Sequence, residues 1–329
     1  MPGLGTRDSG LDSSLWRPNA TLETLKARAE LYGSVRAFFS ARGVMEVDTP
    51  VMSAHATVDR NIESFAVPGG GWLQTSPEFP MKRLLCAGSG PIFQIAPVFR
   101  REERGRHHNP EFRLLEWYRP GWDHHRLMGE VQDLLHALGI AADGPYARRT
   151  YREAFLDHAG FDPFAEPVAR LRARALEGGV PVLDLGMAEE DRDAWLDLWM
   201  SHRVGPRLGV GVPEFLFDFP ASQAALSRVR PDDPPVAERF ELFWQGVELA
   251  NGFHELGDAS EQRRRFQADQ DWRKAQGRAV PPLDAHLIEA LGHGLPDCAG
   301  VALGLDRLLM LKLGLPELAQ ALSFDAQRA

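Results

Sequence analysis

Residues 91–119 read PIFQIAPVFRREERGRHHNPEFRLLEWYR, and this stretch decides the fold that we expect. Its two ends are rich in β-branched and aromatic residues, whereas its middle carries four arginines, two histidines, Asn109 and Pro110. Such a pattern predicts two antiparallel strands joined by a long charged loop. Arg100 stands at the end of the first strand, and Glu102 follows in the loop. A guanidinium and a carboxylate suit a planar, anionic ligand, but a solvated hairpin of mixed charge fits this stretch equally well.

Together with two further segments, this hairpin forms a set of three motifs in a fixed order along the chain. The form FRxE, a loop, then NPEF and LEWY resembles motif 2 of the class II aminoacyl-tRNA synthetases, in their lysine-type branch. ARGVMEVDTP (41–50) resembles motif 1, and GVALGLDRLLML (300–311) resembles motif 3, a strand running into a helix. The resemblance implies an α+β protein with the class II synthetase catalytic fold, an antiparallel sheet flanked by helices.

Composition bounds the domain organisation. The chain has 329 residues, of which 44% are hydrophobic and 25% charged, so it is long enough for a substantial core. The net charge of −9 does not indicate a broad basic face for an RNA duplex. We expect a flexible N-terminal arm over residues 1–20 and one catalytic domain over 21–329. A signal peptide and a membrane-length apolar stretch are both lacking, which predicts a cytoplasmic protein.

The segment around motif 1 predicts a helix and a short strand. Apolar residues recur at helical spacing from Thr21 onward, and Gly43 supplies a stop. VMEVDTP then reads as a strand ended by Pro50. In the resembled family this helix and strand form the dimer interface, so the resemblance implies a homodimer through residues 22–50. The pattern alone describes an ordinary amphipathic helix on a sheet equally well.

TSPE (75–78) lies between a predicted strand, WLQTSPEF, and a predicted helix, PMKRLLCAG, that starts at Pro80. By itself TSPE is more typical of a helix cap than of a site. The family's lysine-activating members carry TSPE before a KRLL helix, where it holds the amino acid.

Glu241, Glu248 and Glu255 recur at intervals of seven in VAERFELFWQGVELANGFHELGD (236–258). Two strand-like runs flank Gln245-Gly246, which predicts a hairpin. Glutamates on adjoining strands can converge on Mg²⁺, which takes one or two carboxylates together with phosphate oxygens. The alternative is surface charge in an acidic chain.

The resemblance also implies the roles of individual residues in an ATP site. The implied ATP-binding residues are Arg100, Glu102, Asn109, Phe112, Glu248, Leu249, Gly304 and Arg307. Arg100 and Arg307 would be catalytic, on the α- and γ-phosphates, and Glu241 and Glu248 would hold Mg²⁺. A general base is not required, because the attacking amino-acid carboxylate is already ionised.

The implied substrate pocket contains Ser76, Glu78, Tyr118, Glu255 and Ala302. Two carboxylates and a phenol make this pocket anionic, and a cationic residue that could receive an aspartate-type side chain is not evident. The resemblance therefore implies a diamino acid of lysine type.

Two departures from a lysyl-tRNA synthetase point to a particular branch of the family. About 20 residues precede the helix that leads into motif 1, too few for the family's anticodon-binding domain, and Ala302 replaces a usual glycine. Both are shared with stand-alone members that attach a lysine, preferably (R)-β-lysine, to a lysine side chain of translation elongation factor P. That resemblance includes FPASQA, ELANGFHEL and GLPDCAG. It implies elongation factor P as the acceptor and speaks against tRNA.

Two other functions stay open. One is a minimal lysyl-tRNA synthetase-like enzyme that charges tRNA or a free amine, and the other is a catalytically silent regulatory paralogue. The intact set of Arg100, Glu102, Glu248 and Arg307 argues against a silent protein. Residues 123–235 are the least informative third, with amphipathic helices that indicate core packing and no chemistry.

Overall fold

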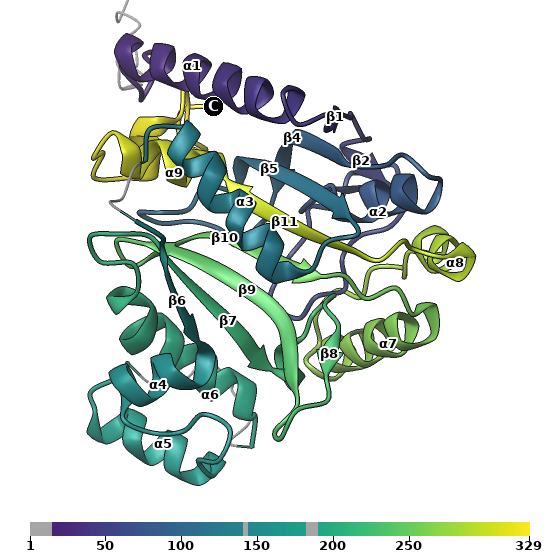
Figure 1. Ribbon diagram of the computed structural model, residues 1–329, viewed down its shortest axis with the longest axis vertical. Coiled ribbons are helices and arrows are strands. Elements are labelled where there is room, and N and C mark those ends of the chain that lie inside the picture. The colour runs from purple at the N-terminus through teal and green to yellow at the C-terminus, as the bar shows by residue number, and fades with distance from the viewer. Residues whose placement is uncertain (1–14, 141–143, 182–189) are drawn as a thin grey trace, which may run out of the picture.

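The computed structural model describes residues 15–140, 144–181 and 190–329 and contains a nine-stranded sheet in the order β1-β4-β5-β11-β10-β9-β7-β6, with β8 paired to β9 (Figure 1). The strands are β1 (Met45–Glu46), β4 (Ile92–Phe99), β5 (Glu111–Pro120), β6 (Ala147–Thr150), β7 (Glu214–Pro220), β8 (Val229–Arg230), β9 (Val236–Trp244), β10 (Val247–His254) and β11 (Cys298–Gly304). Only the end pairs β1/β4 and β6/β7 are parallel. A separate small sheet pairs β2 (Met52–Ser53) with β3 (Trp72–Leu73). The predicted α+β class and largely antiparallel sheet are confirmed.

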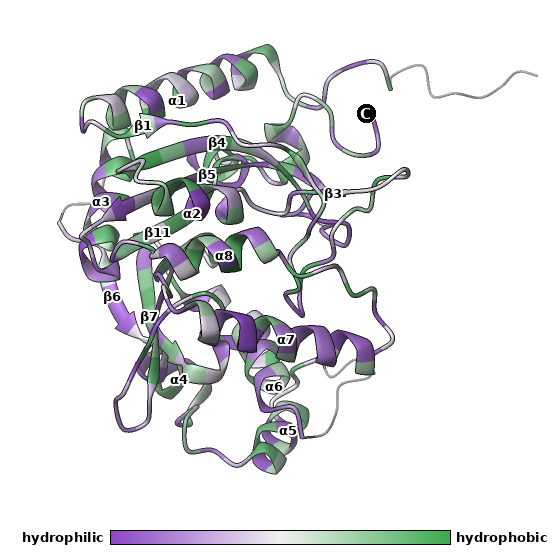
Figure 2. Ribbon diagram, turned by 90° about the vertical axis from the view of Figure 1, so that its right-hand side faces the viewer, coloured by the Kyte–Doolittle hydropathy of each residue, from purple (hydrophilic) through white to green (hydrophobic). Residues whose placement is uncertain are grey.

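Helices flank this sheet. They are α1 (Leu22–Ser40), α2 (Glu78–Cys86), α3 (His124–Ala137), α4 (Tyr151–Ala159), α5 (Val168–Glu177), α6 (Arg192–Trp199), α7 (Ala259–Ala275), α8 (Ala285–His293) and α9 (Leu305–Lys312). Figure 1 shows α3 lying across the central strands, with α1 along one end of the sheet and α4–α6 at the other. Figure 2 shows that α7 is largely hydrophilic, and only three of its side chains are buried. Within the described residues, no helix is both long and apolar enough to span a membrane.

Strict alternation along β5 and β11 separates the core from the opposite face of the sheet. Leu115 and Trp117 of β5, with Val301 and Leu303 of β11, belong to the main hydrophobic core beneath α1, α3 and α9. The intervening residues point the other way, because successive strand side chains alternate in direction. The two strands pair antiparallel, with Glu116 opposite Ala302.

A second hydrophobic core accounts for the part of the chain whose sequence was least informative. Buried residues of α4, α5 and α6 pack on Leu216 and Phe219 of β7, whereas Phe215 faces the main core. Strand β7 is therefore covered on both faces. The predicted strand EFLFDFP coincides with β7 and is confirmed.

Most of the predicted helices and strands are confirmed, but several of their predicted first and last residues are wrong. The predicted helix after Thr21 is α1, for which the Thr21 side chain accepts a hydrogen bond from the Thr24 amide. The expected start of α2 at Pro80 is wrong: the helix begins at Glu78, after Pro77. The strands predicted at 44–50 and 72–79 contain only two residues each, β1 and β3.

The expected N-terminal arm falls mainly on residues 1–14, which lie outside the described residues. Of the rest of that arm, Asn19 and Ala20 donate backbone hydrogen bonds to Ser323 and Leu322. Both ends of the described chain are therefore joined at this point.

A buried ion pair fixes α3 on the sheet. Glu130 accepts hydrogen bonds from Arg119 Nε at 2.8 Å and from the Trp117 indole at 3.1 Å. Its second oxygen is paired with the other end of the Arg119 guanidinium. All three side chains are buried, so each polar group depends on the others for its hydrogen bonds.

We expect Glu130→Ala to lower the free energy of unfolding by about 3–5 kcal/mol, because it leaves the Arg119 charge buried without its partner. Urea unfolding at neutral pH measures this change. Arg264→Gln, which removes a charge on the exposed side of α7, is the control and should leave the midpoint unchanged. Equal effects of the two substitutions would contradict the role given to Glu130.

Candidate active site

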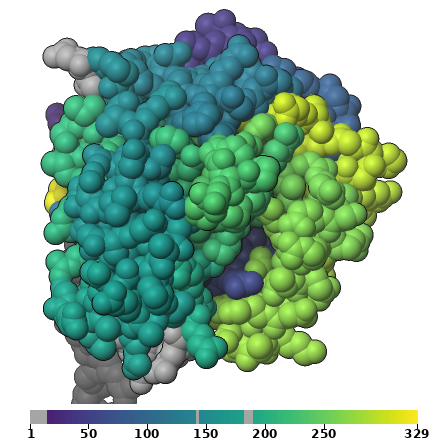
Figure 3. All heavy atoms as spheres, turned by 60° about the horizontal axis from the view of Figure 1, so that its bottom comes forward, coloured from purple at the N-terminus to yellow at the C-terminus, as the bar shows by residue number. Residues whose placement is uncertain are grey.

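One cavity of about 530 Å³ brings together all the predicted site residues except Glu102. Figure 3 shows the surface hollowed between the teal segment that carries α4–α6 and the light-green α7. The residues that line the cavity include Ser76, Glu78, Arg100, Asn109, Phe112, Tyr118, Glu241, Glu248, Leu249, Glu255, Ala302, Gly304 and Arg307. They come from the sheet face opposite α3, from α2 and from the loops that follow β1 and β3.

The outer wall of the cavity is held in place by a buried arginine of α7. Arg273 donates to the carbonyl oxygens of Asp59 and Ile62, at 2.6 and 3.2 Å, and to Glu63 Oε1 at 2.7 Å. Asp59 and Ile62 line the cavity. The position of this wall therefore depends on α7, although α7 contributes no lining residue itself.

Lys82 is buried behind the part of the cavity wall that Glu78 and Glu255 line. Its ammonium is 2.7 Å from Glu78 Oε1, one turn earlier on α2, and 2.6 Å from Glu255 Oε2, at the end of β10. Lys82 and Glu255 are each only 1% exposed. Lys82 therefore links Glu78 and Glu255, the two carboxylates that we expected in the substrate pocket.

Glu116 is a third carboxylate of the same pocket, and it accepts two hydroxyl hydrogen bonds. Ser76 donates to its Oε2 and Tyr118 donates to its Oε1, both at 2.7 Å. Ser76 Oγ in turn accepts from the Glu78 amide at 3.0 Å. Alternation along β5 places Glu116 beside Tyr118 on the cavity face.

Gly300 is required by the close packing of this pocket. A Cβ atom at this position would lie 2.3 Å from the Tyr118 ring and 2.5 Å from Glu255 Oε1. Contacts this short do not occur with real side chains, and neither neighbour is free to move in the buried pocket. Strand β11 therefore presents bare backbone to the carboxylates.

The pocket contains more negative than positive groups. Burial raises the pKa of Glu116 to about 7, and the nearby Glu78 adds to the rise. Burial and Glu78 likewise raise the pKa of Glu255 to about 8, against the opposing effect of Lys82. For Lys82, burial favours the neutral amine, but Glu255 and Glu78 outweigh it and raise the pKa of the ammonium. Three carboxylates around one ammonium suit a ligand that brings further positive charge.

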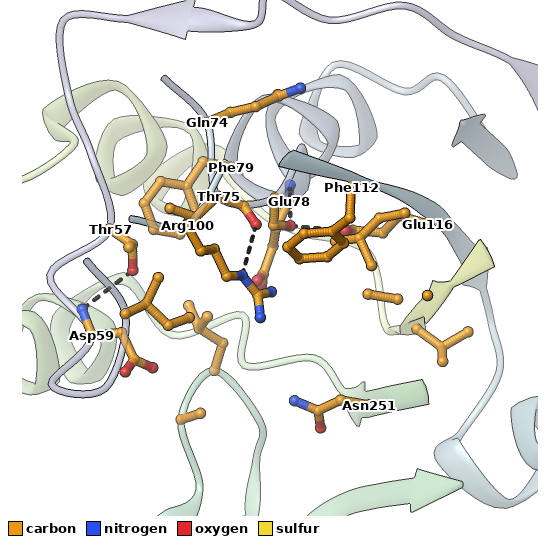
Figure 4. Close-up of a pocket in the computed structure, with 18 of the residues that line it drawn as sticks. Thr57, Asp59, Gln74, Thr75, Glu78, Phe79, Arg100, Phe112, Glu116 and Asn251 are labelled. Atoms are coloured by element: carbon orange, nitrogen blue, oxygen red, sulfur yellow. Dashed lines mark hydrogen bonds between the residues drawn. The ribbon is translucent and has the colours of Figure 1, made fainter. Parts of the chain in front are cut away.

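Arg100 and Phe112 form the adjoining part of the cavity. Arg100 Nε donates a long hydrogen bond, 3.4 Å, to the Thr75 carbonyl oxygen, and the guanidinium carbon lies 5.1 Å from the centre of the Phe112 ring. Figure 4 shows Arg100 reaching into the cavity, with Phe112 and Glu116 on one side and Asp59 on the other. This arrangement leaves an arginine and an aromatic face for a planar, anionic ligand.

Arg307 closes the cavity from the start of α9. It donates to the carbonyl oxygens of His107 and Glu248, both at 3.1 Å, which ties the charged hairpin loop to β10. Asn109 lines the same region, and its amide donates to the Glu111 carbonyl oxygen at 2.6 Å. The loop between β4 and β5 therefore folds over the cavity.

Glu102 is the predicted residue that the structure does not bring to the cavity. Its side chain is 64% exposed and lies 3.9 Å from Arg101, whereas the next residue, Glu103, lines the cavity and pairs with Arg100 and His108. Strand alternation ends at Phe99, so the direction of loop side chains did not follow from the pattern.

Glu241 and Glu248 form a second pair of acidic groups, on β9 and β10. Burial raises the pKa of Glu241 to about 8, with a further rise caused by Glu248. Arg239 forms an ion pair with Glu241, and it also donates to Asn251 Oδ1 at 3.1 Å. A hard divalent cation beside Glu248 would relieve the repulsion between the two carboxylates, so these residues fit the expected magnesium site.

Ala302 lies on the cavity face of β11 and packs against a small cluster that contains Leu114 and Phe112. Its methyl group therefore contacts the part of the cavity wall formed by Phe112 and lies opposite Glu116 in the strand register. We predict that this methyl group favours one lysine isomer over the other, because it fills volume that a glycine would leave open.

The sequence analysis missed Lys82, Glu116 and Gly300 as site residues. Glu116 could have been found, because it is two residues from Tyr118 on the same face of one strand. Lys82 follows Glu78 by one helical turn, which is also a weak signal. Its pairing with Glu255 is a contact between distant segments, for which the sequence carries no local pattern.

Comparisons with known proteins identify the family of this chain. The family model described as tRNA synthetases class II (D, K and N) matches residues 13–328. The chain is 50% identical over 319 residues to a protein of Vibrio vulnificus (strain YJ016) named elongation factor P–(R)-beta-lysine ligase, covering 94% of this chain and 97% of that protein.

Two further relatives carry the same name. The Vibrio cholerae protein (serotype O1, strain ATCC 39315 / El Tor Inaba N16961) is 48% identical over 329 residues, covering 97% of this chain and 100% of the relative. The Salmonella typhi protein is 46% identical over 327 residues, covering 97% and 99%. The chain therefore belongs to the class II tRNA synthetase family of D, K and N enzymes.

Proposed function

We propose that this chain activates (R)-β-lysine, or lysine, with ATP and transfers it to a lysine side chain of translation elongation factor P. The buried pocket of Glu78, Glu116 and Glu255 around Lys82 carries this proposal. The three relatives described above, whose printed name is that of a ligase joining these two substrates, support the choice of amino acid and acceptor.

The charge of the pocket selects the amino acid. A lysine-type substrate brings two ammonium groups, one near its carboxylate and one at the far end of its chain. The three carboxylates exceed the single ammonium of Lys82, so the pocket accommodates that extra charge, and burial strengthens each charged hydrogen bond. An aspartate-type side chain would instead add a fourth carboxylate to this end of the cavity.

Activation requires that the two substrates be held in line. The ionised carboxylate of the amino acid attacks the α-phosphorus of ATP, a new O–P bond forms, and pyrophosphate leaves. Arg100 would stabilise the charge that develops on that phosphate, and Phe112 and Arg307 would hold the adenine. Glu241 and Glu248 would hold Mg²⁺, which supplies positive charge to the phosphates. Positioning and electrostatics then account for the rate.

Transfer consumes the adenylate. The neutral amine of the acceptor lysine attacks the carbonyl carbon, an amide bond forms, the bond to the phosphate oxygen breaks, and AMP leaves while the displaced proton passes to solvent. The cavity extends beyond Arg100 to Thr57 and Asp59, as Figure 4 shows. This extension supplies the approach for an extended lysine side chain from outside.

The decisive assay offers purified protein ATP, either isomer of labelled lysine, and either elongation factor P or tRNA. We expect label on elongation factor P, in an amide bond that survives mild base, and more of it with (R)-β-lysine. Arg100→Ala should reduce adenylate formation on the order of 10²–10³-fold. Arg101→Ala, an exposed neighbour that does not line the cavity, is the matched control and should retain activity.

Label on tRNA as a base-labile ester, with none on elongation factor P, would overturn the acceptor. Pyrophosphate exchange that stays normal in Arg100→Ala would overturn the role of this arginine. Equal transfer of the two lysine isomers would remove the specificity that Ala302 is proposed to supply.

We expect Glu255→Gln to raise KM for the diamino acid about 10- to 150-fold, equivalent to about 1.5–3 kcal/mol for a charged hydrogen bond. The substitution keeps the shape of the side chain and removes its charge. KM for ATP should stay the same, because Glu255 belongs to the proposed amino-acid pocket and not to the proposed nucleotide site. Pyrophosphate exchange measures both constants. Glu289→Gln, on the exposed side of α8, is the control, and an unchanged KM for the amino acid would show that Glu255 does not bind the ammonium.

The proposal includes a homodimer through α1 and β1. Strand β1 is at the edge of the sheet, and Met45 on this strand is 51% exposed. We expect sedimentation velocity at micromolar concentration to give a dimer that Met45→Asp weakens. Leu156→Asp, on the exposed side of α4, should not weaken it. A fully active wild-type monomer would reject the dimer.

A further inference from the structure

A cluster of two histidines and a glutamate lies on the side of the sheet opposite the cavity. His254 on β10 and Glu238 on β9 are the residues next to the register pair Phe253–Arg239. His124 is the first residue of α3, which covers these strands (Figure 1). One potential ligand atom from each of the three side chains lies within 4.8 Å of the other two. None of these residues has a role in the proposed reaction.

His254 is oriented by two carboxylates. Its Nδ1 is 2.7 Å from Glu238 Oε2, and its Nε2 is 2.9 Å from Asp297 Oδ1. Asp297 is also 2.6 Å from Arg228. A histidine that binds a metal through one ring nitrogen commonly donates its other N–H to a carboxylate, as Asp297 would accept here.

His124 takes no part in the hydrogen bonds between His254 and its two carboxylates. Its side chain is only 1% exposed, and neither ring nitrogen has a hydrogen-bond partner among the described residues. Its ring centre lies 6.2 Å from that of His254, in a stacked orientation. A buried imidazole without partners is rare in folded proteins, because its polar atoms have lost their water.

The neighbouring Arg230 does not take up the Glu238 carboxylate. Arg230 lies 4.0 Å from Glu238, but its stronger contacts are with Asp218 at 2.9 Å and Asp232 at 2.8 Å. Glu238 therefore keeps an oxygen directed at His254. The unpartnered nitrogens of His124 complete a set of two imidazoles and one carboxylate.

We propose that His124, His254 and Glu238 bind a zinc ion, with Asp297 fixing the orientation of His254. Two imidazoles and a carboxylate are a ligand set that Zn²⁺ accepts, with water in the fourth position. Zinc bonds of about 2.0–2.1 Å place ligand atoms ~3.3 Å apart, so His254 and Glu238 separate slightly on binding. The ion sits behind the substrate pocket, because His254 and Glu255 are consecutive residues directed to opposite faces of the sheet.

The test uses the full-length protein, freed of metal with a chelator and then dialysed against zinc. We expect one zinc per chain by elemental analysis, and a rise in unfolding temperature with zinc concentration, since a ligand that binds the folded state stabilises it. Substitution by Co²⁺ should give the absorption bands of a four- or five-coordinate site. Asp297→Asn should weaken zinc binding about 10- to 100-fold.

Matched variants assign the ligands. His124→Phe keeps a buried ring and should abolish the stoichiometric zinc and the cobalt bands, as should Glu238→Gln. His125→Phe removes the adjacent, exposed histidine and should change neither. Circular dichroism in the absence of zinc confirms that each variant is folded. Wild type that binds no zinc at 100-fold molar excess, or His124→Phe that binds as wild type does, would overturn the site.

Discussion

The antiparallel pairing of β5 with β11 is the constraint on which the rest of the structure depends. Its register sets Glu116 opposite Ala302 and Tyr118 opposite Gly300. Alternation then sends Trp117 and Val301 into the core beneath α3. A slip of β5 by one residue would place Glu116 in that core and Trp117 in the cavity. The same pairing therefore determines both the hydrophobic packing and the chemistry, and neither can change alone.

The buried charges show how stability and binding are balanced. Lys82 holds Glu78 and Glu255 together, yet one ammonium does not neutralise three carboxylates in a site that excludes water. Burial and the neighbouring carboxylates make ionisation of Glu116 and Glu255 costly, and the pKa values of both groups are raised accordingly. The two ammonium groups of the proposed substrate would favour the ionised forms of these carboxyl groups and so reduce the repulsion.

Local patterns predicted most of the strands and helices, whereas the class of fold and the candidate site residues came from the family resemblance. Strand alternation, the Gln245-Gly246 turn and the apolar spacing of α1 each depend on neighbouring residues, and each was predicted. What failed depended on distance or on irregular backbone: the Lys82–Glu255 pair joins α2 to β10, and Glu102 lies in a loop where alternation no longer applies. The second core on β7 was missed because an amphipathic helix shows which face is apolar but not what covers it.

Gly300 has a consequence for how such a pocket changes over generations. Any mutation that replaces this glycine introduces a Cβ atom, and that atom would overlap Tyr118 and Glu255. Gly300 can therefore be replaced only after Tyr118 and Glu255 have changed. Changes to the pocket are thus easier at positions that already carry a Cβ atom, such as Ala302, while the backbone beside Tyr118 and Glu255 stays fixed.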